Sequence, residues 1–125
     1  MLLDTYALVE LFEGTKKGEV VKKFLKRESK VYLSVLSIYE LGTHLEREIG
    51  IDAAQEYIRS VQIHYDIIDV NQSITLHAVE IRRENKLPVV DCLIYATARS
   101  TKSRVVSGCK HFKSIRKSKD VIILE

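Results

Sequence analysis

Met1-Leu2-Leu3-Asp4-Thr5 is a short apolar run that ends in a carboxylate. Two further acids have similar surroundings: Glu40 in Val35-Leu36-Ser37-Ile38-Tyr39-Glu40-Leu41, and Asp91 in Leu87-Pro88-Val89-Val90-Asp91-Cys92-Leu93. We expect each where a short strand gives way to a helix, and the carboxyl ends of parallel strands converge on one crevice. Three acids there repel one another unless a cation joins them, and Mg²⁺ and Mn²⁺ prefer oxygen ligands of this kind. The pattern therefore predicts metal-dependent chemistry on phosphate.

Outward from these acids, apolar periodicity predicts strands and helices in alternation. The expected strands are residues 1–4, 31–33, 65–70, 105–106 and 121–124. The expected helices are residues 5–13, 16–27, 34–50, 52–62, 71–85, 91–100 and 111–115. Such alternation is typical of an α/β fold with a mainly parallel sheet. A chain of 125 residues without a linker or repeat is expected to form one domain, 1–125.

The amino-acid composition restricts the classes of protein to which the chain can belong. A chain with 46% hydrophobic and 30% charged residues is typical of a soluble globular protein. No stretch has the apolar length of a membrane span, and no basic leader follows Met1, so the cytoplasm is the expected location. Cys92 and Cys109 are expected to be buried free thiols, and the lack of CxxC or HxxxH groupings disfavours a zinc site. The lack of GxSxG, Walker and GxGxxG motifs disfavours serine hydrolases, P-loop enzymes and dinucleotide enzymes.

Positive charge is concentrated in one segment. Residues 99–119 hold eight basic residues and no acid, whereas the rest of the chain holds 12 basic and 17 acidic residues. A segregated basic segment is the electrostatic footprint of a polyanion-binding surface, although a solvated surface without a partner gives the same pattern. The acidic crevice favours nucleic acid, and the expected RNA-binding residues are Arg99, Lys102, Arg104, Lys110, Lys113, Arg116 and Lys117.

Each acid also has a purely structural interpretation. Asp4 and Asp91 could be helix N-caps, since Asp is favoured there. Glu40 could close a capping box with Ser37, although Ser34 competes as the cap and would leave Glu40 inside the helix. A carboxylate beside an apolar face needs a partner or an ion to offset desolvation. His111 could touch a phosphate, and a surface histidine is the simpler reading.

Taken in order, four segments resemble the successive signatures of PIN-domain ribonucleases, closest to VapC-type toxins. They are Met1 to Thr5, Leu33 to Leu41, Leu87 to Ala98 and Val105 to Phe112, and together they run through the whole chain. The resemblance implies a five-stranded sheet in the order 3-2-1-4-5 flanked by helices. It also implies an acidic pocket holding Mg²⁺ or Mn²⁺, hydrolytic cleavage of RNA, a homodimer, and a small antitoxin protein as partner.

The resemblance assigns roles to particular residues. Asp4, Glu40 and Asp91 match the first three acids of the family, which are its catalytic and metal-binding residues. Thr5 matches the hydroxyl residue after the first acid, and Ser107 matches the hydroxyl position before the fourth.

The chain departs from the family pattern at two positions. Cys109 replaces the fourth acid, and a thiol is a poor ligand for Mg²⁺. Tyr6 stands where the family has a small polar residue. The alternative reading is therefore a PIN fold with weakened catalysis that acts as an RNA- or protein-binding module. A receiver-like phosphoacceptor domain is a third reading, but it requires an adjacent acid pair that Leu3-Asp4-Thr5 does not supply.

Overall fold

The computed structural model describes all 125 residues as an α/β domain of five strands and seven helices. The strands are β1 (Leu2–Leu3), β2 (Tyr32–Ser34), β3 (Asp66–Ile68), β4 (Val105–Ser107) and β5 (Val121–Ile123). The helices are α1 (Thr5–Glu13), α2 (Lys16–Arg27), α3 (Val35–Ile49), α4 (Ile51–His64), α5 (Gln72–Glu84), α6 (Val89–Ser100) and α7 (Lys110–Lys113). None of the helices combines the length and apolar character needed to cross a membrane.

The five strands form one parallel sheet in the order β3-β2-β1-β4-β5, which confirms the predicted order. The central strand β1 pairs on one side with β2, where Leu2 is opposite Tyr32, and on the other with β4, where Leu2 is opposite Val105. Because every strand runs the same way, the carboxyl ends of β1, β2 and β4 lie at one edge. That edge is where Asp4 and Ser107 are placed.

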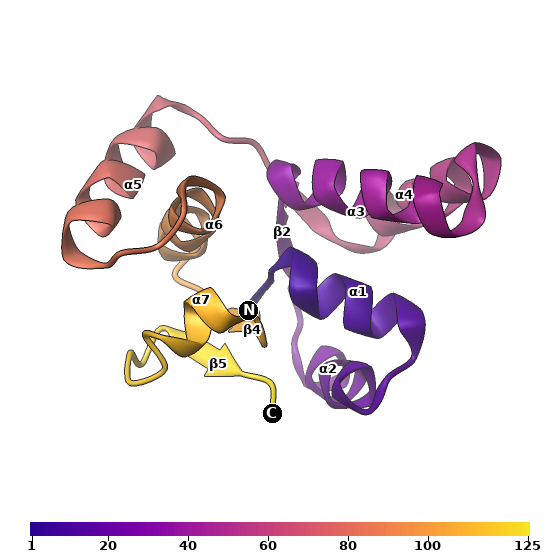
Figure 1. Ribbon diagram of the computed structural model, residues 1–125, viewed down its shortest axis with the longest axis horizontal. Coiled ribbons are helices and arrows are strands. Elements are labelled where there is room, and N and C mark those ends of the chain that lie inside the picture. Colours follow the sequence, from indigo (N-terminus) through magenta and orange to yellow (C-terminus); the bar gives the residue numbers. More distant parts are fainter.

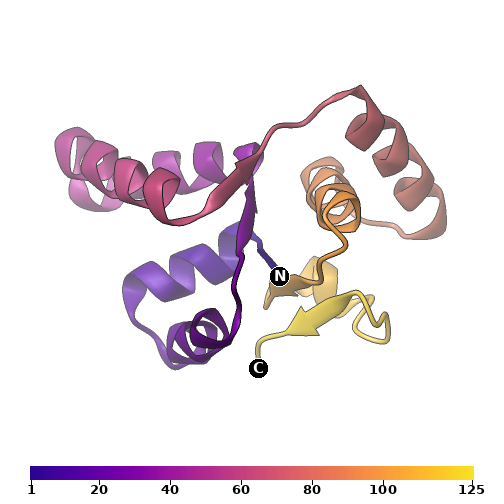
Figure 2. The same cartoon turned by 180° about the vertical axis from the view of Figure 1, so that it is seen from behind.

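Alternation of side chains along the short strands divides the core in two. Leu2 and Val105 face a cluster formed with α5, α6 and α7, whereas Leu3 and Val106 face a cluster formed with α1 to α4. Figure 1 shows these two groups of helices on opposite sides of the strands. Figure 2 shows the connection from β3 to α5 crossing from one group to the other.

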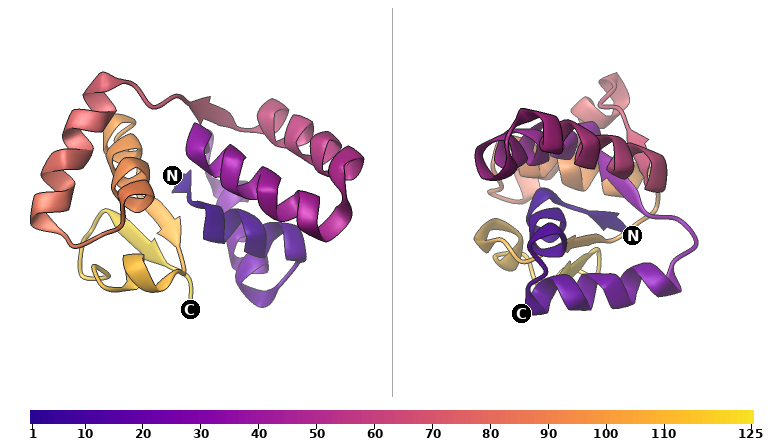
Figure 3. Two further views of the ribbon diagram at one scale, coloured as in Figure 1. Left: turned by 45° about the horizontal axis from the view of Figure 1, so that its top comes forward. Right: turned by 90° about the vertical axis from the view of Figure 1, so that its right-hand side faces the viewer.

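The helices pack largely in consecutive pairs. Figure 3 shows α3 beside α4 and α5 beside α6, and α1 contacts α2 in the same way. The α1–α2 pair is close because Gly18 has no side chain, and a Cβ atom at that position would collide with the backbone carbonyl of Glu10. Gly14 ends α1 in the left-handed region, with φ of 68°, which glycine adopts without the usual steric cost.

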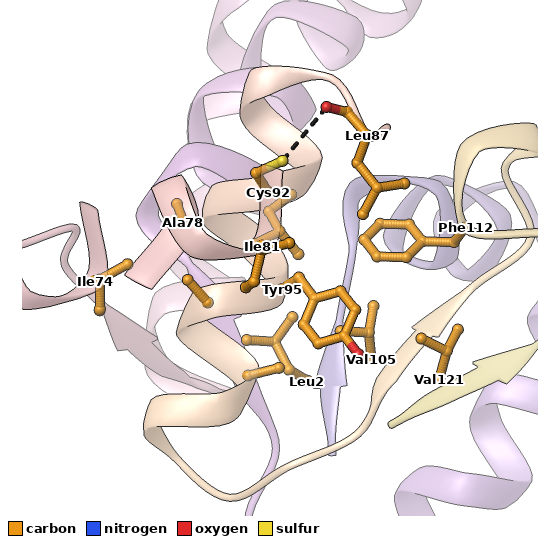
Figure 4. Packing of buried hydrophobic residues seen from close by; sticks show 13 residues of the cluster. Leu2, Ile74, Ala78, Ile81, Leu87, Cys92, Tyr95, Val105, Phe112 and Val121 are labelled. Carbon is orange, nitrogen blue, oxygen red and sulfur yellow. Dashed lines mark hydrogen bonds between the residues drawn. The ribbon is translucent and has the colours of Figure 1, made fainter. Parts of the chain in front are cut away.

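Cys92 lies within the α5–α6–α7 cluster, as expected for a buried thiol. Figure 4 shows it beside Leu87, whose backbone oxygen accepts a hydrogen bond from its Sγ at 3.4 Å. Tyr95 and Phe112 fill the space between α6 and the sheet in the same view. Cys109, in contrast, is only partly buried. The prediction that both cysteines are buried is therefore wrong for Cys109, which lies in the loop after β4.

The predicted elements are all present, with shifted boundaries. The largest difference concerns Asp91, because α6 begins at Val89 and residues 85–88 link it to α5 without forming a strand. The expectation that each acid follows a strand is therefore wrong for Asp91. Its side chain still reaches the carboxyl edge of the sheet because α6 is a crossover helix that leads back to β4. The first turn of such a helix lies at the edge where the parallel strands end.

Candidate metal centre

Asp4 is the most buried acid of the chain, with 3% of its surface exposed. It directly follows β1 and caps α1, because its Oδ1 accepts a hydrogen bond from the Ala7 N–H at 2.9 Å. Burial raises the pKa of Asp4 to about 7, against the opposing effect of hydrogen bonds from Ser107 and Ala7. The neighbouring charges of Asp91 and Glu40 raise that pKa further. Asp4 therefore caps α1, while its burial makes the ionised form of its carboxyl unfavourable.

Glu40 projects from the second turn of α3 and is held by a hydroxyl. The Thr5 Oγ1 donates a hydrogen bond to Glu40 Oε1 at 2.6 Å and lies 3.2 Å from Ser37 Oγ. The capping box proposed for Ser37 does not form, because Ser34 caps the helix by accepting from the Leu36 N–H at 3.1 Å. Glu40 is therefore free of a structural role at the helix end, and Thr5 fixes its position.

Asp91 lies in the first turn of α6 rather than at its N-cap, which is Pro88. Its Oδ2 is 3.0 Å from Nδ1 of His111, a residue on α7. Burial raises the pKa of Asp91, the contact with His111 opposes that rise, and the charge of Glu40 adds to it. Asp4, Glu40 and Asp91 line one pocket, so the three acids lie together as the sequence predicted.

The loop after β4 closes this neighbourhood. The Ser107 Oγ accepts a hydrogen bond from the Cys109 N–H at 3.1 Å and also bonds to Asp4. Gly108 lets this loop pass close to Tyr6, because a Cβ at position 108 would collide with the Tyr6 ring. The Tyr6 hydroxyl in turn accepts a hydrogen bond from Lys17 Nζ at 2.8 Å. The unexpected tyrosine is thus accommodated by a glycine and anchored by a lysine of α2.

These residues line one small pocket of about 160 Å³, formed by Asp4, Thr5, Tyr6, Glu40, Asp91, Ile94, Cys109 and His111. Three hollows elsewhere are larger, and the largest, of about 450 Å³, contains Glu28 as its sole acid. Size does not identify the reactive site here, because only the small pocket gathers several interacting acids. No lysine or arginine lines it to neutralise them.

The donors of this pocket fit a hard divalent cation. Asp4, Glu40 and Asp91 supply carboxylate oxygens, which Mg²⁺ and Mn²⁺ prefer. A bound cation would offset both the burial of Asp4 and the mutual repulsion that raises its pKa.

His111 is the pocket residue that sequence reasoning did not assign. The sequence favours a simple surface histidine, yet its imidazole contacts Asp91 and lines the pocket. The available signal is its spacing from Cys109, which lies two positions earlier and shortly after a predicted strand. That spacing matches no common metal-binding motif, so the pattern alone did not separate it from a surface residue.

The basic residues predicted to bind RNA lie in separate parts of the domain. Lys110 and Lys113 lie on α7, which begins at the pocket edge. Arg99 is eight residues beyond Asp91 on α6, about 12 Å along the helix axis. It stacks over the Tyr95 ring and lies 3.7 Å from Asp120. Lys102 and Arg104 precede β4 and thus lie at the opposite edge of the sheet from the acids.

Arg116 and Lys117 follow α7 and are exposed. Arg116 pairs with Glu125, with Nη1 2.7 Å from Oε1. The seven basic residues therefore do not form one surface around the pocket, and Lys110 and Lys113 are the two whose helix borders it.

The chain is similar to a known protein family and to several solved structures. The PIN domain family model matches residues 1–118. A toxin–antitoxin complex from Klebsiella pneumoniae contains a similar structure, with a TM-score of 0.79 and 23% identity over 99% of this chain and 97% of that one. A search of the curated proteins found no matching sequence.

Two further solved structures have the same fold. VapBC-1 from nontypeable Haemophilus influenzae gives a TM-score of 0.79 at 15% identity, covering 98% of this chain and 96% of that one. A VapC toxin from Mycobacterium tuberculosis that cleaves the sarcin–ricin loop gives a TM-score of 0.70 at 17% identity, covering 91% and 93% of the two chains. At these identities the likeness establishes the fold over the full length of the domain.

Proposed function

The chain belongs to the PIN domain family, and we propose that it is a metal-dependent endoribonuclease acting as the toxin of a toxin–antitoxin pair. The observation that carries the proposal is the buried carboxylate Asp4, which shares with Glu40 and Asp91 one pocket that no lysine or arginine lines. The toxins and toxin–antitoxin complexes among the similar structures support the biological role.

In the proposed mechanism Asp4, Asp91 and Glu40 would hold Mg²⁺ or Mn²⁺. The bound ion would lower the pKa of water and offset negative charge on the reacting phosphate. Thr5 orients Glu40 through its 2.6 Å hydrogen bond, so that the carboxylate can accept a proton from attacking water or complete the ion's ligands. Ser107 and the Ala7 N–H orient Asp4 in the same way.

The proposed substrate is RNA, bound first by the basic residues of α7. Lys110 is exposed and Lys113 is partly buried, and the helix that carries them begins directly after Cys109. They can contact phosphates adjacent to the scissile one. Arg116 and Lys117 would extend this path, whereas Arg99, Lys102 and Arg104 would contact RNA only along the far side of the domain.

We further propose a homodimer in the cytoplasm and a small antitoxin protein as partner. Similar structures are described as toxin–antitoxin complexes, one of them from Klebsiella pneumoniae. The exposed apolar side chains Tyr39 and Ile63 offer surface for such assembly, with 73% and 80% of their area exposed.

An RNA cleavage assay tests the proposed chemistry. The wild-type protein should cleave RNA with Mg²⁺ or Mn²⁺ and lose activity in a chelator. Asp4→Asn and Asp91→Asn should each be inactive, while Asp52→Asn, which changes an exposed acid on α4, should retain full activity. Cleavage that survives the chelator, or that survives in a folded Asp91→Asn protein, would refute the proposal.

Cys109 favours a second candidate, in which the domain binds RNA or protein without cutting. The family has an acid at this position, and the thiol that replaces it lines the pocket. Under this reading the wild-type protein would bind RNA without cleaving it under any metal condition, and Cys109→Asp would restore cleavage. Cleavage by the unmodified protein would exclude this candidate.

A further inference from the structure

We infer that Asp91, Cys109 and His111 form a site for a thiophilic divalent cation, for which Zn²⁺ is the expected ion. One donor atom from each of these residues lies within 4.8 Å of the other two. The set combines a thiol, an imidazole and a carboxylate, so it differs chemically from the all-oxygen set of Asp4, Glu40 and Asp91. This inference stands independently of the proposed nuclease activity, because it concerns binding alone.

The spacing of the donors suits a tetrahedral ion. Zinc bonds of about 2.0 Å to nitrogen or oxygen and about 2.3 Å to sulfur place neighbouring ligand atoms about 3.3–3.5 Å apart in a tetrahedral site with one sulfur. His111 Nδ1 and Asp91 Oδ2 are already 3.0 Å apart. The third donor, Cys109 Sγ, lies within the 4.8 Å limit of both. Small side-chain rotations therefore suffice to complete the geometry.

The backbone holds these three residues in place before any ion binds. Cys109 is the N-cap residue of α7, and its N–H is bonded to Ser107 Oγ. His111 follows on α7, which is anchored by the fully buried ring of Phe112. Asp91 comes from the separate helix α6. Three protein ligands leave a fourth position open to the pocket, as in zinc sites that keep a water or substrate position.

Ligand chemistry selects the ion. Thiolate and imidazole favour zinc, whereas Mg²⁺ binds oxygen ligands almost exclusively. Cys109 would bind as the thiolate and release its proton to solvent, so the step requires no oxidant or reductant. Asp91 belongs to both sets of donors, and an ion held by Cys109 and His111 would therefore compete for it with an ion held by Asp4 and Glu40.

Cobalt provides a probe because Co²⁺ occupies zinc sites and a thiolate ligand gives it a charge-transfer band in the near ultraviolet. Titration of the purified protein with Co²⁺ should produce this band, and added Zn²⁺ should remove it. Cys109→Ser should lack the band. Its Zn²⁺ affinity, measured in competition with a chromophoric chelator, should be more than tenfold weaker than that of the wild type. A loss of about tenfold is the smallest one typical of residues that only support a metal ligand. His111→Gln should also weaken Zn²⁺ binding more than tenfold.

Three further variants separate the possible results. Cys92→Ser changes the other cysteine, which is buried and bonded to Leu87, and should keep the band. Asp4→Asn should also keep it, although this variant is expected to have no nuclease activity. Cys109→Asp should lose the band and provides a second test if Cys109→Ser does not fold. A wild-type protein without the band, a band that survives in Cys109→Ser or Cys109→Asp, or full Zn²⁺ affinity in His111→Gln would overturn the inference.

Discussion

Asp4 shows how one buried residue can serve the fold and oppose it. Its side chain caps α1 by accepting the Ala7 N–H, which favours folding. Its burial makes the ionised form unfavourable, so the pKa of the carboxyl rises to about 7. A raised pKa means that the folded state holds a proton that the unfolded chain releases. The stability contributed by that proton is present at low pH and is lost as the pH rises.

This linkage predicts a pH-dependent gain from Asp4→Asn. Asparagine keeps the capping oxygen and carries no charge. In a chelator, the variant should match the wild type near pH 4 and become more stable as the pH rises toward 7. At pH 8 the difference in unfolding free energy should reach about 2–4 kcal/mol, because each pKa unit corresponds to about 1.4 kcal/mol. Urea unfolding at several pH values measures it, and a constant difference would contradict the prediction.

The substitution Cys109→Asp tests the acid that the chain lacks. A carboxylate in place of a thiol adds a hard ligand to the acidic pocket and should tighten Mg²⁺ and Mn²⁺ binding. Calorimetric titration should detect a gain of at least tenfold, and the RNA cleavage rate should increase with it. Cys109→Asn is the matched variant of equal size without the charge. If Asp and Asn behave alike at position 109, the added carboxylate does not reach the ion.

Tyr6 and Gly108 should be energetically coupled, because a methyl group at position 108 would enter the space of the Tyr6 ring. Gly108→Ala should destabilise the protein by about 1–3 kcal/mol, the usual cost of overpacking. In a Tyr6→Val background the same substitution should cost much less. A double-mutant cycle by thermal or urea unfolding measures this coupling, and equal costs in both backgrounds would show that the ring yields without strain.

At the scale of elements, sequence patterning anticipated most of the structure. The runs at Leu2–Leu3 and Val105–Ser107 form neighbouring strands, and their ends place Asp4 and Ser107 at the same edge of the sheet. Asp91 does not follow the expectation that each acid comes directly after a strand, because it lies on α6, a helix that returns across the sheet. His111 is not identified by the sequence because its contact with Asp91 joins α7 to α6 across 20 positions, and short-range patterns do not encode such contacts.

The position of α7 predicts which lysines bind RNA. Lys110→Gln with Lys113→Gln should reduce the dependence of RNA affinity on salt by about 1.4 in the logarithmic slope, since each single-strand phosphate contact contributes about 0.7. Lys102→Gln with Arg104→Gln removes the same charge at the opposite edge of the sheet and should leave the slope nearly unchanged. Fluorescence anisotropy with a catalytically inactive variant provides the measurement. Equal effects of the two pairs would place the RNA elsewhere.

At the scale of the whole molecule, the homodimer stays a prediction, and the structure leaves fewer apolar residues free to form its interface than the sequence alone suggests. The sequence offers α1 and α3 seven apolar residues that could form such an interface: Leu8, Leu11, Phe12, Val35, Leu36, Ile38 and Tyr39. Leu8 is buried, and Leu11, Phe12 and Ile38 pack against the core, so these four serve the fold. Tyr39 is the residue of the seven that is mostly exposed.

We therefore expect twice the monomer mass by light scattering at micromolar concentration. Tyr39→Glu should shift the protein toward monomer, because it places a charge on the exposed apolar face of α3. Ile63→Glu alters an equally exposed apolar residue on α4 and serves as the comparison. A monomeric wild-type protein would refute the homodimer, and dissociation by Ile63→Glu alone would move its interface from α3 to α4.

The pairing of β1 with β4 has a consequence for the synthesis of the protein on the ribosome. Leu2 pairs with Val105, which is added more than a hundred positions later. At a translation rate of about 5–20 residues per second, the first strand waits for seconds without one of its two neighbours. Asp4 is made first, but Ser107, Cys109 and His111 reach it only after β4 has emerged. The pocket around Asp4 therefore stays incomplete in the nascent chain until nearly the entire domain has been translated.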